Sequence, residues 1–533
     1  MKKSLKRMLV FALAGFLGAT GRAQTLDAIG VTVLRAVTTN LNGTGIRVGQ
    51  PEGNATVGQT NYEVNPSVAG QPTNFFTYIY GTSPYLTVST STNFPNALGI
   101  ESGHADTVAN NFYGTDHGVA TNVAHVDNYE ANTFVYYYIG YVLNNPHSIS
   151  ERIVNQSFTF GSVDTTADQD YDNYAAQNSV LFISGAGFLN TNVWSPATCY
   201  NGMGVGVSDY SQPTYGPTPD GRSKPDIVAP HYPDYSTSYA APQVAGAAAV
   251  LMQAGLRGDG GGDTNSAVDI RTLKALLLNG AVKPAGWTNV IWTNGTRLVL
   301  DTNYGAGVLN VFNTYKQLAG GKHGYNFSTN VPAGTPHPPV VMTNAISVWS
   351  GWDFNTNTSS GSADAVSHYF FNLTNSVSNA TFTATTTLVW NRQSGQASIN
   401  NLNLFFYKAA NSNLVACSTS LVDNVEHIFV PKLAPGRYDL QVLKKGGSFV
   451  SAGEPYALAW EFFTETLNAS KSGTNVVLSW PVFPDGFHVE ATANLSAPNW
   501  SASGLPSPVV TNNRNMILLN AANAPQFFRL RTP

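Results

Sequence analysis

The sequence has only two cysteines, Cys199 and Cys417, among its 533 residues. Two cysteines this far apart exclude a disulfide scaffold and argue against a cysteine-based metal site, so the stability must come from packed cores. Long apolar runs are also missing, because the best one after the N-terminus, Ala240 to Leu251, is short and contains Pro242 and Gln243. We therefore predict no transmembrane segment.

Basic residues are few once the N-terminal segment is set aside. This segment has Lys2, Lys3, Lys6 and Arg7, then apolar residues 8–17, then Gly21-Arg22-Ala23, which is the order of a cleaved signal peptide over residues 1–23. The pattern predicts a secreted protein, whether extracellular, periplasmic or at the cell surface. Its removal leaves 22 basic against 31 acidic residues, a net charge of −9. This balance disfavours nucleic acid or an anionic membrane as a partner.

The length is too great for one ordinary core and predicts a large domain with smaller ones after it. Between residues 45 and 318, short apolar runs alternate with segments of helical periodicity, which favours an α/β fold built on a parallel sheet. Active sites of such sheets lie at the carboxyl ends of the strands. The buried strands are expected at 46–50, 122–127, 153–157 and 180–184, and helices around 104–113, 134–143, 238–254 and 267–279.

A proline-rich stretch with Pro332, Pro336, Pro338 and Pro339 predicts a linker at 326–344 after an α/β domain over residues 24–325. Beyond it, alternating polar and apolar runs predict a β-sandwich domain at 345–465 and a small β-module at 466–533. Aromatic residues of these C-terminal modules could contact a carbohydrate or another surface, but core packing is the favoured interpretation.

Ser238 stands at the start of a helical run rich in small residues, Ser236 to Gly246, with Pro242 in its first turn. A helix start leaves backbone N–H groups unpaired, and these would stabilise an oxyanion on an acyl group bound to Ser238. Ser238 is therefore a candidate nucleophile, although small residues suit a closely packed buried helix equally well.

A serine nucleophile needs a base, and the base needs an acceptor that orients it. His104 is the best-placed base because it follows a glycine at an expected helix start. Glu52 closes the first expected strand, where its carboxylate could accept a hydrogen bond from the His104 ring.

The order of acid, histidine and serine, and the residues around each, resemble the subtilisin-like serine proteases, or subtilases. The serine run is similar to the family's Gly-Thr-Ser-x-Ala-x-Pro-x-Val-Ala-Gly, and 224–230 is similar to its Lys-Pro-Asp-x-x-Ala-Pro; the resemblance covers about residues 40 to 318. It implies a subtilisin-like parallel sheet flanked by helices and a serine endopeptidase that acts on protein or peptide substrates. We expect no cofactor and no metal at the site, and the sequence leaves a structural calcium site open. It also implies that Ser157 and Phe158 flank the substrate and that Thr237 helps to form the oxyanion site.

Four departures from the family pattern concern activity. Asp106, two residues after His104, is an extra carboxylate that the family's His-Gly-Thr-x-Val-Ala-Gly lacks, and we expect it to point away from the His104 face. Glu52 replaces the usual aspartate, which keeps the charge and both acceptor oxygens. Phe188 stands where the family has the asparagine that donates to the oxyanion, and losing one such donor typically lowers turnover about 100- to 1000-fold. Ser236 replaces a glycine, which predicts some strain in the turn. The alternative function is therefore a catalytically impaired subtilase scaffold that acts in binding or adhesion at the cell surface.

An acidic cluster at a further helix start is ambiguous. Its spacing matches no known calcium loop, so we interpret it as a solvated helix start rather than a calcium site. The cluster consists of Asp164, Asp168, Asp170 and Asp172.

Overall fold

The computed structural model describes most of the chain after the first 25 residues. The described ranges are 26–208, 213–231, 236–289, 292–293, 296–332, 344–359, 361–374, 381–447, 450–464, 467–472, 474–481, 488–494, 499–511, 514–520 and 527–531. The predicted signal peptide and residues 333–343 of the predicted linker lie outside them.

The first part of the chain forms an eight-stranded sheet in which every neighbouring pair is parallel except the edge pair β3–β4. The central strands are buried along nearly their whole length, as a parallel sheet covered on both faces requires. The predicted α/β class is therefore confirmed. In sheet order the strands are β10 (Ile227–Ala229), β9 (Met203–Val207), β8 (Leu181–Gly185), β7 (Ile153–Gln156), β1 (Arg47–Glu52), β6 (His125–Glu130), β3 (Phe76–Gly81) and β4 (Val88–Ser91).

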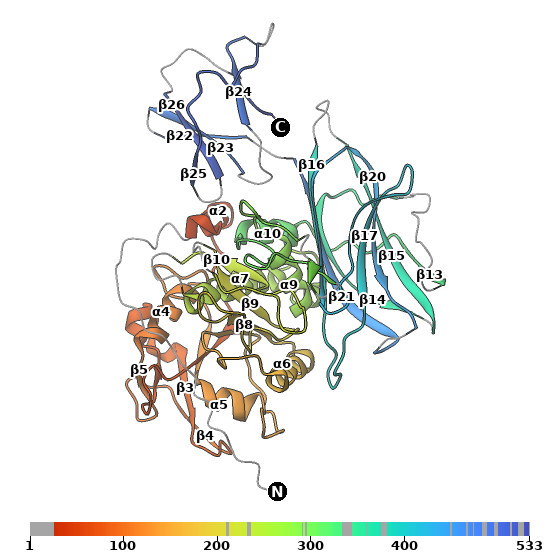
Figure 1. Cartoon of the computed structure of the whole chain (residues 1–533). Helices are drawn as coiled ribbons and strands as arrows, with labels where there is room; N and C mark the ends of the chain where they lie inside the picture. Colours follow the sequence, from red (N-terminus) through yellow and green to blue (C-terminus); the bar gives the residue numbers. More distant parts are fainter. Residues whose placement is uncertain are drawn as a thin grey trace.

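Helices pack on this sheet, and α7 (Thr237–Arg257) lies against β7, β8 and β9 (Figure 1). Its small residues are needed for packing: a Cβ on Gly246 would lie 2.6 Å from Val119 and 3.1 Å from the carbonyl of Phe112. This close approach holds the end of α4 against α7. The other helices are α2 (Val31–Val37), α3 (Pro66–Ala69), α4 (Gly103–Phe112), α5 (Ala131–Thr133) continued by a π-helical turn (Phe134–Tyr138), α6 (Thr165–Asn178), α8 (Thr264–Ala267), α9 (Ile270–Asn279) and α10 (Val311–Ala319).

Two small pairs of strands complete this domain. They are β2 (Asn61–Glu63) with β5 (Ile100–Glu101), and β11 (Trp292–Thr293) with β12 (Thr296–Arg297). No helix in the described part of the chain is long and apolar enough to cross a membrane.

The next domain consists of two antiparallel sheets around an aromatic core, a β-sandwich as predicted. Trp390 and Trp460 are fully buried in this core, and Trp352 is buried beneath the α/β domain, so these tryptophans form no surface for a sugar. The sheets are β13 (Phe327–Pro332), β15 (Ala363–Leu373), β20 (Gly436–Lys444), β17 (Leu402–Lys408) and β18 (Asn413–Ser418), and β14 (Ser350–Thr358), β21 (Gly453–Phe463), β16 (Phe382–Trp390) and β19 (Val425–Leu433).

The predicted linker at 326–344 needs a correction. Residues Phe327–Pro332 form strand β13, which pairs with β15 along its whole length. Pro332 is tolerated because it closes a strand at the edge of the sheet. The sandwich therefore begins before the proline-rich stretch.

The sandwich packs directly on the α/β domain through α9 and α10 (Figure 1). Asn279, the last residue of α9, accepts hydrogen bonds from the hydroxyls of Thr385 and Thr387 on β16, each at 3.0 Å. Gln317 of α10 donates to Glu461 on β21 at 2.9 Å. The contact is thus polar and buried.

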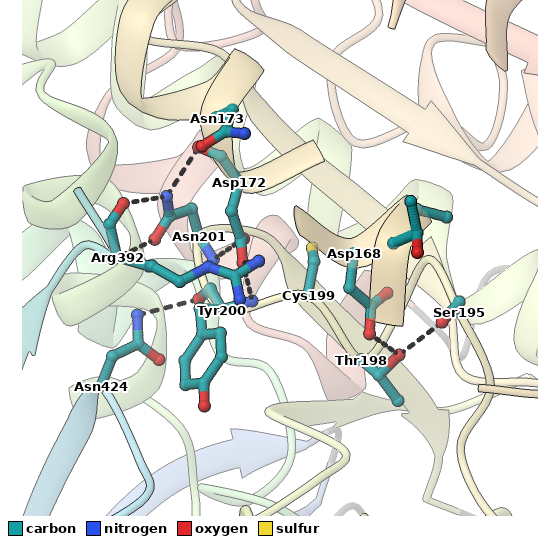
Figure 2. Close-up of polar contacts among 12 residues, drawn as sticks. Asp168, Asp172, Asn173, Ser195, Thr198, Cys199, Tyr200, Asn201, Arg392 and Asn424 are labelled. Atoms are coloured by element: carbon teal, nitrogen blue, oxygen red, sulfur yellow. Dashed lines mark hydrogen bonds and ion pairs between the residues drawn. The ribbon is translucent and has the colours of Figure 1, made fainter. Parts of the chain in front are cut away.

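The acidic cluster at the start of α6 was predicted to be solvated, and the structure differs from this prediction. Asp164 does cap α6, accepting from Thr166 N and Ala167 N at 3.0 Å. Asp168 and Asp172, however, are buried: Asp168 accepts from Thr198, and Asp172 pairs with Arg392 of the sandwich (Figure 2). They are inner contacts, not solvated charges.

The last part of the chain forms a small β-module around Trp480, which is buried. Its strands are β22 (Asn468–Ser472), β23 (Asn475–Pro481), β26 (Arg514–Asn520) and β25 (Val509–Thr511) in one sheet, and β24 (His488–Thr492) with β27 (Phe527–Arg531) in another.

Candidate active site

Glu52 and His104 form a fully buried pair at the carboxyl end of β1. Nδ1 of His104 lies 2.9 Å from Oε2 of Glu52, and both side chains are 0% exposed. The other carboxylate oxygen of Glu52 accepts from Gln50 Nε2 at 2.9 Å, and Gln50 accepts in turn from the Tyr113 hydroxyl at 2.5 Å. The carboxylate is therefore held on both sides, and the bond to Nδ1 fixes the orientation of the imidazole.

Asp106 points away from this pair, although it is only two residues after His104. Its carboxylate accepts from the backbone amide of Asn65 at 2.7 Å. Burial raises the pKa of Asp106 to about 7; the Asn65 amide opposes this rise, and the carboxylate of Glu101 adds to it. Asp106 is thus part of the loop packing and does not compete with Glu52 for His104.

Ser238 lies in the first turn of α7 and is half-buried. Its hydroxyl donates to the carbonyl of Ser157 at 3.4 Å, and the Ser157 hydroxyl donates to the carbonyl of Ser238 at 2.7 Å. The ring of the next residue, Tyr239, lies 5.6 Å from the His104 ring, centre to centre. The structure thus brings Ser238 and Ser157 into contact and places the ring of Tyr239, the residue after Ser238, near the ring of His104.

The hydrogen bond between Ser238 and His104 is not formed in this structure. Nε2 of His104 is buried and has no hydrogen-bond partner within the described ranges. Hydrogen bonds of catalytic groups are often long before substrate binds, so this nitrogen is the free position to which a proton from Ser238 could move.

Phe188 lies where the oxyanion donor was expected, and it carries none. Its half-buried ring packs edge-on against Trp194, with 5.4 Å between ring centres. The hydroxyl of Thr237 donates to the carbonyl of Gly187 at 2.7 Å and is thereby already engaged. The amide of Ser238 donates to the hydroxyl of Ser236 at 3.3 Å.

Two further sequence predictions concern residues near Ser238. Phe158 is only 2% exposed as a whole residue, and its ring packs near Phe160. Ser236 has φ −99° and ψ 131°, which is ordinary extended backbone. The predicted turn strain at Ser236 is therefore wrong: the residue is a regular helix N-cap.

Sequence analysis missed Gln50, which donates to Glu52, and Tyr113, which donates to Gln50. Gln50 could have been found, because residues two apart in a strand point to the same face. Tyr113 gave no such signal, since its contact depends on how α4 packs on β1. Within the described residues, no group of three histidine, cysteine or acidic side chains is arranged to hold a metal ion.

The central part of this domain is similar to a known protein family. Residues 138–307 match the family model of Peptidase_S8, the subtilase family. The match includes Ser238 and Phe188 and begins after Glu52 and His104. No curated protein matches the chain.

Two solved structures are remotely similar. One is tripeptidyl peptidase 2, with 12% identity over 78% of this chain and 44% of that chain, and a TM-score of 0.30. The other is the epidermin leader peptide processing serine protease from Staphylococcus aureus, with 14% identity over 58% of this chain and 84% of that chain, and a TM-score of 0.36. This chain thus spans less than half the length of tripeptidyl peptidase 2. The central part of the α/β domain, residues 138–307, is therefore similar to the subtilase family.

Proposed function

We propose that the chain is a secreted serine endopeptidase that hydrolyses peptide bonds in protein or peptide substrates with Ser238, His104 and Glu52. The observation that carries this proposal is the buried Glu52–His104 pair, with Nδ1 bonded to the carboxylate and Nε2 left without a partner. Export rests on the N-terminal sequence alone. N-terminal sequencing of the exported protein tests it.

In the proposed reaction, Oγ of Ser238 attacks the peptide carbonyl carbon while its proton moves to Nε2 of His104. Glu52 accepts from Nδ1 and stabilises the imidazolium that forms. The imidazolium then gives its proton to the leaving amine, and a water molecule, activated by the neutral ring, hydrolyses the acyl-enzyme. The longer Glu52 side chain meets the need for an acceptor, because its Oε2 reaches Nδ1 at 2.9 Å.

A fluorophosphonate probe, which labels activated serines, tests this proposal. We expect the wild-type protein to be labelled, Ser238→Ala to be unlabelled, and Ser67→Ala, a change at an exposed serine, to be labelled like the wild type. Glu52→Gln is expected to lower the labelling rate, because a neutral amide cannot stabilise the imidazolium. Unlabelled wild-type protein, correctly folded, would rule out the peptidase.

The second candidate is a catalytically impaired subtilase scaffold acting in binding or adhesion at the cell surface. The observation that favours it is the oxyanion side of the site: Phe188 has no donor, and the Thr237 hydroxyl is engaged by Gly187. The same labelling experiment separates the two candidates, since a binding scaffold has no activated serine.

A further inference from the structure

Ser236, the N-cap of α7, lies two residues before the proposed nucleophile. It accepts hydrogen bonds from backbone amides in the first turn of this helix. Its hydroxyl oxygen accepts from Ser238 N at 3.3 Å. Its carbonyl accepts from Tyr239 N at 3.0 Å and from Ala240 N at 3.2 Å. The extended backbone of Ser236 lets the side chain turn back over the first turn of the helix.

The other hydroxyls near the Ser238 amide already donate their hydrogens to backbone carbonyls. Thr237 donates its own to Gly187, and Ser157 donates its own to the carbonyl of Ser238. Phe188 has no polar hydrogen. The Ser236 hydroxyl only accepts, and no described residue accepts its hydrogen within bonding distance. Among the described hydroxyls bonded at or next to the Ser238 amide, the one on Ser236 therefore still has its hydrogen available.

The position of this hydroxyl also fits a donor. An oxyanion on a carbon bonded to Ser238 must lie about 2.7 to 3.1 Å from an amide that stabilises it. Ser236 Oγ approaches the same N–H hydrogen, so the oxyanion and the hydroxyl oxygen would be neighbours. That contact is attractive only when the hydroxyl turns its hydrogen toward the oxyanion.

We propose that Ser236 is a further catalytic residue: its hydroxyl donates to the oxyanion and takes the place of the donor that Phe188 lacks. This inference rests on the proposed peptidase function. As the bond from Ser238 Oγ to the carbonyl carbon forms, the electron pair of the C=O bond moves to the oxygen, and the Ser236 hydrogen bonds to it. When the tetrahedral intermediate collapses, this hydrogen bond is lost and Ser236 itself stays unchanged.

The test uses saturation kinetics of a fluorophosphonate, whose phosphoryl oxygen develops the same charge. We expect Ser236→Gly to lower the maximal labelling rate on the order of 100-fold while the probe concentration at half-saturation changes little. Glycine suits this test because it is accepted at N-caps almost as well as serine. Ser236→Thr keeps the hydroxyl and is expected to stay within a few-fold of the wild type.

A second background makes the test specific. The variant Phe188→Asn places a side-chain amide at this position. In this background, Ser236→Gly should lower the maximal labelling rate about tenfold or less, so the effects of the two changes are non-additive. Thermal unfolding of each variant checks that the fold is kept. An equal loss in both backgrounds would mean that Ser236 acts only by supporting the helix.

A maximal labelling rate of Ser236→Gly equal to or above that of the wild type would mean that the Ser236 hydroxyl merely competes with the oxyanion for the Ser238 amide. This result would overturn the inference. The failure of the proposed function has a different signature, because the wild type itself would then not be labelled. A labelled wild type with an insensitive Ser236 refutes this inference alone.

Discussion

The ion pair between Arg392 and Asp172 joins the two large domains, and its removal is a direct test of how firmly they are joined. Asp172 lies on α6 of the α/β domain and is fully buried, whereas Arg392 follows β16 of the sandwich and is 8% exposed. Figure 2 shows the guanidinium of Arg392 between Asp172 and the ring of Tyr200, whose centre lies 4.9 Å away. The change to make is Arg392→Met, which keeps an unbranched apolar stem but removes the guanidinium and its charge.

The structure sets the size of the effect. Without Arg392, the Asp172 carboxylate keeps two amide donors, Asn201 N at 2.7 Å and Tyr200 N at 3.2 Å. Burial already raises the pKa of Asp172 against the opposing influence of Arg392, so losing the cation leaves an uncompensated buried charge. Breaking such a pair typically lowers the free energy of unfolding by about 3 to 5 kcal/mol. We expect about 3 kcal/mol, because Nη2 lies 2.7 Å from the carboxylate but makes no aligned hydrogen bond.

Urea unfolding of the whole chain, followed by tryptophan fluorescence and circular dichroism, measures this effect. Asp172→Asn is expected to be destabilising as well, and the double variant to be more stable than the sum of the single changes by about 2 kcal/mol, since neither charge is then left alone. The control is Arg257→Met, which breaks the exposed pair with Asp259 and should change stability by less than about 1 kcal/mol. The reasoning would be refuted if the losses in free energy of unfolding of the two single variants simply added in the double variant. It would also be refuted if Arg392→Met and the control lowered this free energy equally.

Two more predictions concern Asp106 and Asn279. Burial raises the pKa of Asp106 to about 7, so between about pH 4 and pH 7 the folded state binds more protons than the unfolded state, and stability falls as the pH rises. Asp106→Asn keeps an acceptor for the Asn65 amide but cannot titrate, so its free energy of unfolding, measured in urea across this window, should fall less steeply with pH than that of the wild type; parallel slopes would contradict this. Asn279→Ala removes the acceptor shared by Thr385 and Thr387 and should lower the free energy of unfolding by about 2 kcal/mol in the same assay. A loss below about 0.5 kcal/mol would show that these hydroxyls find other acceptors.

Most of the sheet could be predicted from the sequence, because buried parallel strands are marked by short continuous apolar runs. The expected strands at 46–50, 153–157 and 180–184 correspond to β1, β7 and β8. The contact between domains could not be predicted in this way. Arg392 and Asp172 are 220 positions apart in the sequence, and nothing around either residue indicates that the two meet. The same is true of β13, whose strand character depends on its partner β15 and not on its own proline-ending sequence.

The position of a candidate site residue was predictable where the residue lies at the end of an element. Glu52 ends β1, and His104 and Ser238 lie in the first turns of α4 and α7. The roles of side chains that act through tertiary contacts were not predictable. Tyr113 reaches Gln50 only because α4 packs over β1, and the burial of the Phe158 side chain depends on the rings around it.

Phe188 and Ser236 illustrate why departures from a family pattern must be weighed together. In the sequence they are 48 positions apart, and each alone is a loss: one donor is missing, and one flexible glycine is replaced. In the structure both belong to the surroundings of the Ser238 amide, with Phe188 following the glycine that Thr237 binds and Ser236 bonded to the amide itself. One change removes a side-chain donor from this region and the other adds one, so under the proposal the pair keeps one side-chain donor for an oxyanion. If Ser236→Gly and Phe188→Asn prove non-additive in labelling rate, the site is adapted and not degenerate, and the impaired-scaffold function loses the observation that favours it.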